Sequence, residues 1–87
     1  MMIRDATLTL RAIMAGGDSR RRHGRLTDEQ RRVRDETRET LRAHRAAVRG
    51  DAPPTDAEAY CEAARRLQGE WARATGGKVG YASPLNR

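Results

Sequence analysis

The scarcity of large aliphatic side chains limits what this chain can fold into more than any other feature. Its 87 residues include 2 Ile, 6 Leu and 3 Val, which makes 11, and no Phe. Eleven of 87 is about 13%, below the roughly 20% at which disorder becomes a serious alternative. Ala, Arg and Glu are abundant, and all three favour helices. We therefore expect one small all-α domain, residues 1–87, and leave open whether self-association or a partner completes its thin core.

The strongest helix signal covers Thr55–Gly76. Thr55 and Glu58 have the spacing of a capping box, and the two prolines before them disfavour an earlier helical start. At 100° per residue, the residues expected to face the core fall in an arc of about 140°. They are Ala57, Tyr60, Cys61, Ala64, Leu67, Gln68, Trp71 and Ala74. The aromatic rings of Tyr60 and Trp71 are expected to anchor the core.

A second helix is predicted over Thr27–Arg49. Thr27 and Gln30 have capping-box spacing, and Gly50 suits a left-handed C-terminal cap. The core-facing stripe of this helix is thin. It comprises Gln30, Val33, Thr37, Leu41, His44 and Val48. On such a stripe we expect His44 to be half-buried and hydrogen-bonded rather than a metal ligand.

The other segments carry weaker signals. Residues 1–15 fit either one helical face or an alternating strand, and we favour the helix because a lone strand would have no partner. Residues 16–26 are predicted to be a basic loop, with Gly16-Gly17 ending the first helix. Residues 50–54 form a linker short enough to make the flanking helices antiparallel neighbours. Residues 77–87 are expected to be an irregular tail whose apolar residues either dock on the hairpin or serve a partner. The predicted fold is a helical hairpin or three-helix bundle.

Arginine dominates the charge. Of 18 basic residues 17 are Arg, against 12 acidic residues, and the net charge is +6. On the helix over 27–49, six of them share an arc about 80° wide and about 27 Å long, with the acids elsewhere. These are Arg31, Arg34, Arg38, Arg42, Arg45 and Arg49. The predicted loop adds Arg20, Arg21, Arg22 and Arg25. These ten arginines are the candidate nucleic-acid contacts, because guanidinium groups bind phosphate oxygens in pairs of hydrogen bonds.

This pattern predicts a small accessory protein that binds the DNA or RNA backbone mainly through phosphates and without sequence readout. The alternative is a protein–protein interaction module, such as an adaptor, an inhibitor or an assembly subunit, whose arginines face an acidic protein surface. A third interpretation is a solvated face, or one neutralised within the fold by Glu58, Glu62 and Glu70. Arg and Ala at this level also suit a GC-rich genome, whether chromosomal, phage or plasmid.

No pattern of catalytic or metal-binding residues is recognisable. His23, His44 and Cys61 lack the spacing of a zinc site, and there is no phosphate-loop motif. So short a chain has little apolar material to line a dry pocket, so we expect neither enzyme activity nor a cofactor. A lone cysteine, expected to be buried, fits a reducing compartment. Arg11 interrupts the N-terminal apolar run, which favours neither a signal peptide nor a membrane span, so a cytoplasmic protein is expected.

Overall fold

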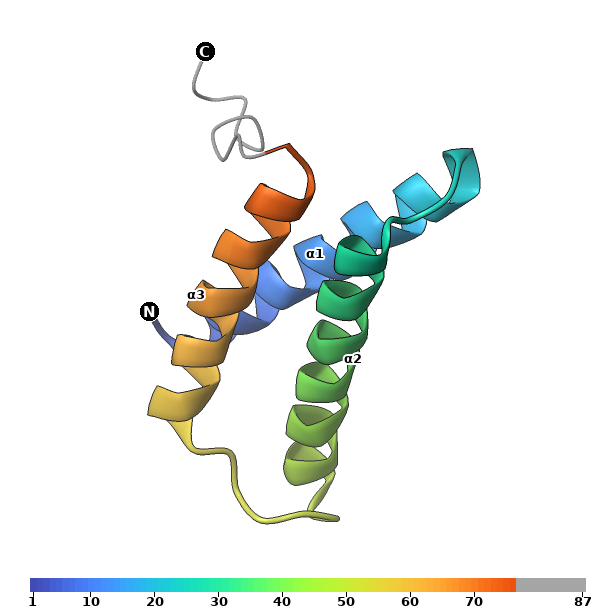
Figure 1. Cartoon of the computed structure of the whole chain (residues 1–87). Helices are drawn as coiled ribbons and strands as arrows, with labels where there is room; N and C mark the ends of the chain where they lie inside the picture. The colour runs from blue at the N-terminus through green and yellow to red at the C-terminus, as the bar shows by residue number, and fades with distance from the viewer. Residues whose placement is uncertain (77–87) are drawn as a thin grey trace.

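Three α helices make up the part of the chain, residues 1–76, that the computed structural model describes. They are α1 (Ile3–His23), α2 (Asp28–Arg49) and α3 (Ala57–Ala74). Figure 1 shows α2 and α3 side by side and antiparallel, joined at one end by the linker, with α1 crossing behind both. Each helix packs against the other two, so the predicted all-α fold is confirmed. The prediction of an irregular tail lies outside the described residues.

The first helix is longer than the sequence indicated. It was predicted to end at Gly16-Gly17 and to give way to a basic loop over residues 16–26, but α1 continues to His23. A Cβ atom on Gly16 would lie 3.4 Å from the indole of Trp71, and one on Gly17 would lie 2.8 Å from Cδ of Arg34. The two glycines therefore let α1 approach the other helices closely. The loop prediction was wrong because this packing offsets the low helix propensity of glycine.

Local hydrogen bonds define both ends of α2 as predicted. Thr27 Oγ1 accepts a hydrogen bond from Gln30 N at 3.0 Å, and Thr27 N donates to Gln30 Oε1 at 3.1 Å. Gly50 closes the helix in the left-handed region, with φ 86°, and its N–H donates to Ala47 O at 3.1 Å. The Gln30 amide also donates to Ala74 O at 2.9 Å, which ties the start of α2 to the end of α3.

The start of α3 differs from the prediction. The expected capping box of Thr55 and Glu58 is wrong, because Asp56 is the N-cap and its Oδ1 accepts from Ala59 N at 3.1 Å. A carboxylate at this position also interacts favourably with the positive end of the helix dipole. The Thr55 hydroxyl is instead hydrogen-bonded to His44 Nδ1 at 2.8 Å, which links the linker to α2.

All three helices contribute to a small core. Its buried members are Ala6, Leu10, Ile13, Val33, Leu41, Tyr60, Cys61, Ala64 and Leu67. Thr37 is buried too, and its hydroxyl donates to Val33 O at 2.8 Å. Trp71 is only half-buried at the edge of this core, so it is a weaker anchor than expected. Val48, placed on the core stripe by its spacing, is 73% exposed because the last turn of α2 extends beyond the crossing with α1.

Candidate nucleic-acid interface

The arginines between α2 and α3 are neutralised by acids. Arg32 lies 2.8 Å from Glu29 and 3.2 Å from Glu70. Arg66 lies 3.0 Å from Glu70 and also pairs with Glu36, which in turn lies 3.5 Å from Arg32. We call these five residues the α2–α3 charge network. From the sequence, Glu70 was one of three acids that could neutralise the arginine arc of α2. In the structure it pairs instead with Arg32 and Arg66, which lie outside that arc.

The hydrogen bonds of this network shift the pKa values of Arg32, Arg66 and Glu70. Partial burial alone would raise the pKa of Glu70, but hydrogen bonds from Arg66 and Arg32 outweigh it and hold that pKa below its ordinary value. The hydrogen bond to Glu29 is the main reason why the pKa of Arg32 is raised. The bond to Glu36 does the same for the pKa of Arg66. Both arginines, although half-exposed, are thus paired with acids of the same chain.

On the arginine arc of α2, four members pair with an acid close in sequence. The pairs are Arg31–Asp28 (3.0 Å), Arg38–Asp35 (3.5 Å), Arg42–Glu39 (3.1 Å) and Arg49–Asp51 (3.1 Å). The four arginine side chains stay 41–65% exposed. Exposed pairs of this kind contribute little to stability. Within residues 1–76, Arg45 makes no ion pair at all.

Arg34, predicted to share this surface, is not on it. Its side chain is only 8% exposed, since α1 covers it at Gly17. Its Nη1 and Nη2 lie 3.7 Å from the carboxylates of Asp18 and Asp35 respectively. Nε and Nη1 have no hydrogen-bond partner among the described residues. Arg34 therefore cannot contact a phosphate in this structure, and the correction leaves nine of the ten candidate arginines.

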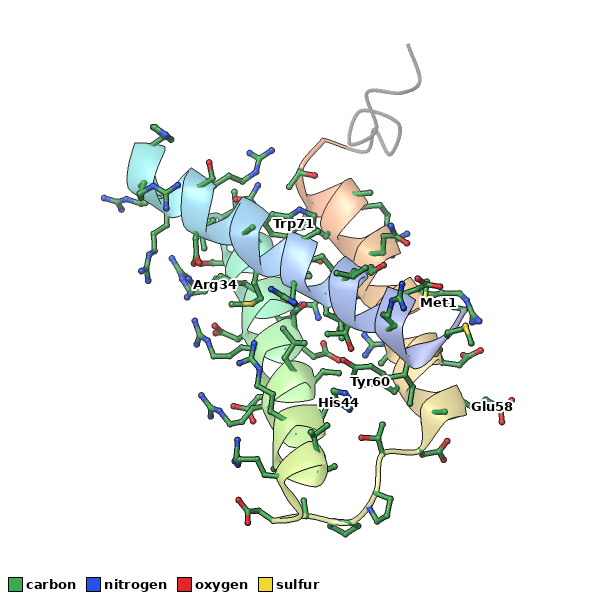
Figure 2. The ribbon with its side chains drawn as sticks, turned by 180° about the vertical axis from the view of Figure 1, so that it is seen from behind. Met1, Arg34, His44, Glu58, Tyr60 and Trp71 are labelled. Atoms are coloured by element: carbon green, nitrogen blue, oxygen red, sulfur yellow. The ribbon has the colours of Figure 1, made fainter. Side chains whose placement is uncertain are left out.

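The end of α1 carries the least neutralised charge. Arg20, Arg21 and Arg22 lie exposed in its last turn, and Arg25 is exposed in the connection to α2. In the part of the chain that the structure describes, none of the four makes an ion pair. Figure 2 shows side chains with blue nitrogen tips along one edge of the molecule, from the end of α1 down α2. We call the surface arginines of this region the arginine edge. Its members are Arg20, Arg21, Arg22, Arg25, Arg31, Arg38, Arg42, Arg45 and Arg49.

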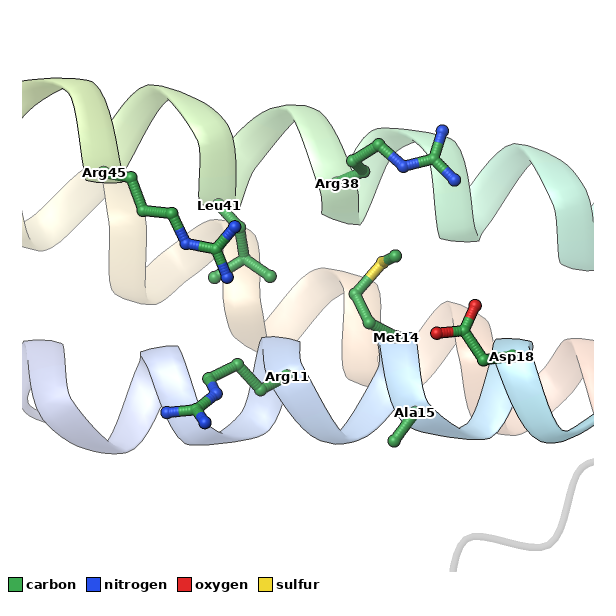
Figure 3. Close-up of a pocket in the computed structure, with 7 residues that line it drawn as sticks. All are labelled: Arg11, Met14, Ala15, Asp18, Arg38, Leu41 and Arg45. Atoms are coloured by element: carbon green, nitrogen blue, oxygen red, sulfur yellow. The ribbon is translucent and has the colours of Figure 1, made fainter.

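A groove of about 300 Å³ lies between α1 and α2, beside this edge (Figure 3). We call it the α1–α2 groove. Its lining residues are Arg11, Met14, Ala15 and Asp18 from α1 and Arg38, Leu41 and Arg45 from α2. Sequence reasoning missed Arg11, because only the crossing of the two helices brings it beside the arginines of α2.

The remaining reactive side chains have structural roles. His44 is hydrogen-bonded as expected, and its ring stacks on Tyr60 with centroids 4.6 Å apart. Cys61 is buried, and its thiol donates to Met1 O at 3.2 Å. Residues 1–76 contain no cluster of three or more His, Cys, Asp or Glu side chains that could bind a metal ion.

Comparisons of the chain with protein-family models, with curated proteins and with solved structures found no match. In the described part of the chain, no helix combines the length and the apolar character that crossing a bilayer requires.

Proposed function

We propose that the protein binds nucleic acid through phosphate contacts made by the arginine edge. The observation that supports this most strongly is the last turn of α1, where three consecutive arginines are exposed and have no ion-pair partner within residues 1–76. Successive residues on a helix point about 100° apart, so these three side chains fan out and reach phosphates in several directions. A regular helix also holds them more firmly than the loop expected from the sequence.

The arginine-edge residues on α2 extend the same surface. From Arg31 to Arg49 they span about 27 Å of helix, enough to follow several successive phosphates. Their acidic partners are exposed, so exchanging them for phosphates costs little, while release of counterions from the nucleic acid favours binding. Arginines that contact only the backbone carry no base information, so unrelated sequences should bind alike.

Replacing the three arginines of the last turn of α1 tests the proposal. In a fluorescence-anisotropy titration, R20Q/R21Q/R22Q should bind any duplex more weakly than wild type. It should also flatten the slope of log affinity against log salt by up to about three units. Helix content should hold, because Gln is nearly as good a helix former as Arg.

The matched control is R4Q/R65Q/R73Q. It removes the same charge from three exposed helical positions outside the arginine edge. The control should keep most of the affinity and the salt slope of wild type. The proposal fails if wild type shows no binding to DNA or RNA at about 50 mM salt. It also fails if the two triple variants lose affinity equally, since net charge alone would then explain the binding.

A further inference from the structure

The two ends of the α1–α2 groove differ in charge. At one end, Arg45 of α2 reaches toward the groove beside Leu41, and Arg11 lies along α1 on the opposite wall (Figure 3). Neither guanidinium makes an ion pair within the described residues. At the other end, Arg38 lies across from Asp18, whose carboxylate is 3.7 Å from the buried Arg34. The groove thus has a two-arginine end that attracts an anion and a second end where charges of both signs meet.

The middle of the groove is aliphatic and firmly held. Leu41 is 4% exposed and belongs to the core, while Met14 is half-buried and packs against the same core. Leu41 forms the floor of the groove, so the aliphatic surface that a ligand can remove from water belongs to Met14, whose adaptable thioether suits a variety of aliphatic groups. The arrangement favours a ligand that carries an anionic group next to an aliphatic one.

We propose that the α1–α2 groove docks an acidic amphipathic segment of a partner protein. An aliphatic side chain of the segment covers Met14, and a carboxylate three or four residues away on the same helical face lies at the end formed by Arg11 and Arg45. Arg38 already pairs with Asp35, but Arg11 and Arg45 make no ion pair within residues 1–76, and their two charges give the complementarity that selects an acidic partner. This site shares Arg38 and Arg45 with the arginine edge but does not include the three arginines at the end of α1.

Nucleic acid fits the groove less well than an acidic peptide. None of the seven lining residues is aromatic, whereas sites for unstacked bases usually provide aromatic rings for stacking. A sugar–phosphate backbone would satisfy Arg11 and Arg45 but would leave the aliphatic surface of Met14 uncovered. The peptide covers both features at once.

The test uses a labelled synthetic helical peptide with Leu and Glu recurring on one face, and the same peptide with every Glu replaced by Gln. Wild type should bind the Glu peptide and bind the Gln peptide about tenfold more weakly or worse. R11Q/R45Q should reduce affinity for the Glu peptide by a similar factor. The matched control, R4Q/R73Q, removes two exposed arginines outside the groove and should bind the Glu peptide like wild type.

Charge reversal sharpens the test. R11E/R45E should lose the Glu peptide and gain binding to a third peptide with Lys in place of Glu. Circular dichroism of each variant should match wild type, because Arg11 and Arg45 are exposed helical positions. The proposal is overturned if wild type does not bind the Glu peptide, or if R11Q/R45Q and R4Q/R73Q bind it equally.

The same variants distinguish this groove from the arginines at the end of α1. R20Q/R21Q/R22Q should lose affinity for a duplex oligonucleotide and keep its affinity for the Glu peptide. R11Q/R45Q should lose more affinity for the Glu peptide than for the oligonucleotide. If R11Q/R45Q instead affects only the oligonucleotide, the groove is a nucleic-acid site and the peptide proposal is wrong. Failure of all oligonucleotide binding would leave the peptide result unaffected.

Discussion

The two sides of α2 use the same residue type in opposite ways. Toward α3, Arg32 and Arg66 are surrounded by three glutamates, and each is bound to two or more of them. Toward α1, three arginines of the α1–α2 groove meet one aspartate, which also lies beside the buried Arg34. The comparison shows that acids from both helices pair with Arg32 and Arg66, whereas Arg11 and Arg45 make no ion pair within residues 1–76.

The largest effect should come from breaking the packing on which both sides of α2 depend. Leu67 of α3 is fully buried, so Leu67→Ala should cost about 2–5 kcal/mol, a large share of the stability of so small a domain. Leu8→Ala is the matched control, because Leu8 is 54% exposed on α1 and its loss should change stability by about 0.5 kcal/mol or less. Urea unfolding followed by circular dichroism measures both. Equal unfolding midpoints for the two variants would contradict the core described here.

A smaller effect should follow from disturbing only the α1 side. A methyl group on Gly17 would lie 2.8 Å from Cδ of the buried Arg34, so Gly17→Ala should destabilise the protein by about 1 kcal/mol or more, despite the better helix propensity of Ala. In Gly69→Ala the new methyl group would meet only the end of Arg73, at 3.7 Å. That variant should therefore gain about 0.5–1 kcal/mol. If the melting temperatures of both variants rise, the close packing of α1 at Gly17 against Arg34 would be contradicted.

The smallest effect should come from the α3 side and should depend on pH. Since the pKa of Glu70 is lowered in the folded chain, its stabilisation is present above the ordinary carboxyl pKa and is lost as pH falls through the folded value. Glu70→Gln should therefore melt below wild type at pH 7, and the difference should shrink as pH falls below the ordinary carboxyl pKa and the Glu70 carboxylate becomes protonated. Glu62→Gln removes an exposed carboxylate outside the α2–α3 charge network and should shift the melting temperature less. A Glu70→Gln variant as stable as wild type at pH 7 would show that the network does not stabilise the fold.

Features that depend on residues within one or two helical turns were predictable from the sequence. The Thr27–Gln30 capping box and the Gly50 cap form as expected, because their hydrogen bonds join residues three or four apart. Helical periodicity also placed Leu41 and Leu67 in the core correctly. The Asp56 cap was missed because two adjacent residues were both suitable N-caps, and only contact with His44 engages the Thr55 hydroxyl elsewhere.

The tertiary structure alone decided which arginines remain at the surface. From their spacing on α2, Arg34 and Arg38 were equally expected to be exposed. In the structure, α1 packs against Arg34 and buries it. The same packing carries the first helix past Gly16-Gly17 and brings Arg11 next to Arg45. Helical periodicity gives the direction of each side chain from its own axis, but the point where another helix crosses depends on contacts between residues far apart in sequence. The sequence determined where the helices form and which faces carry charge, and the crossing of α1 determined which of those charges can meet a ligand.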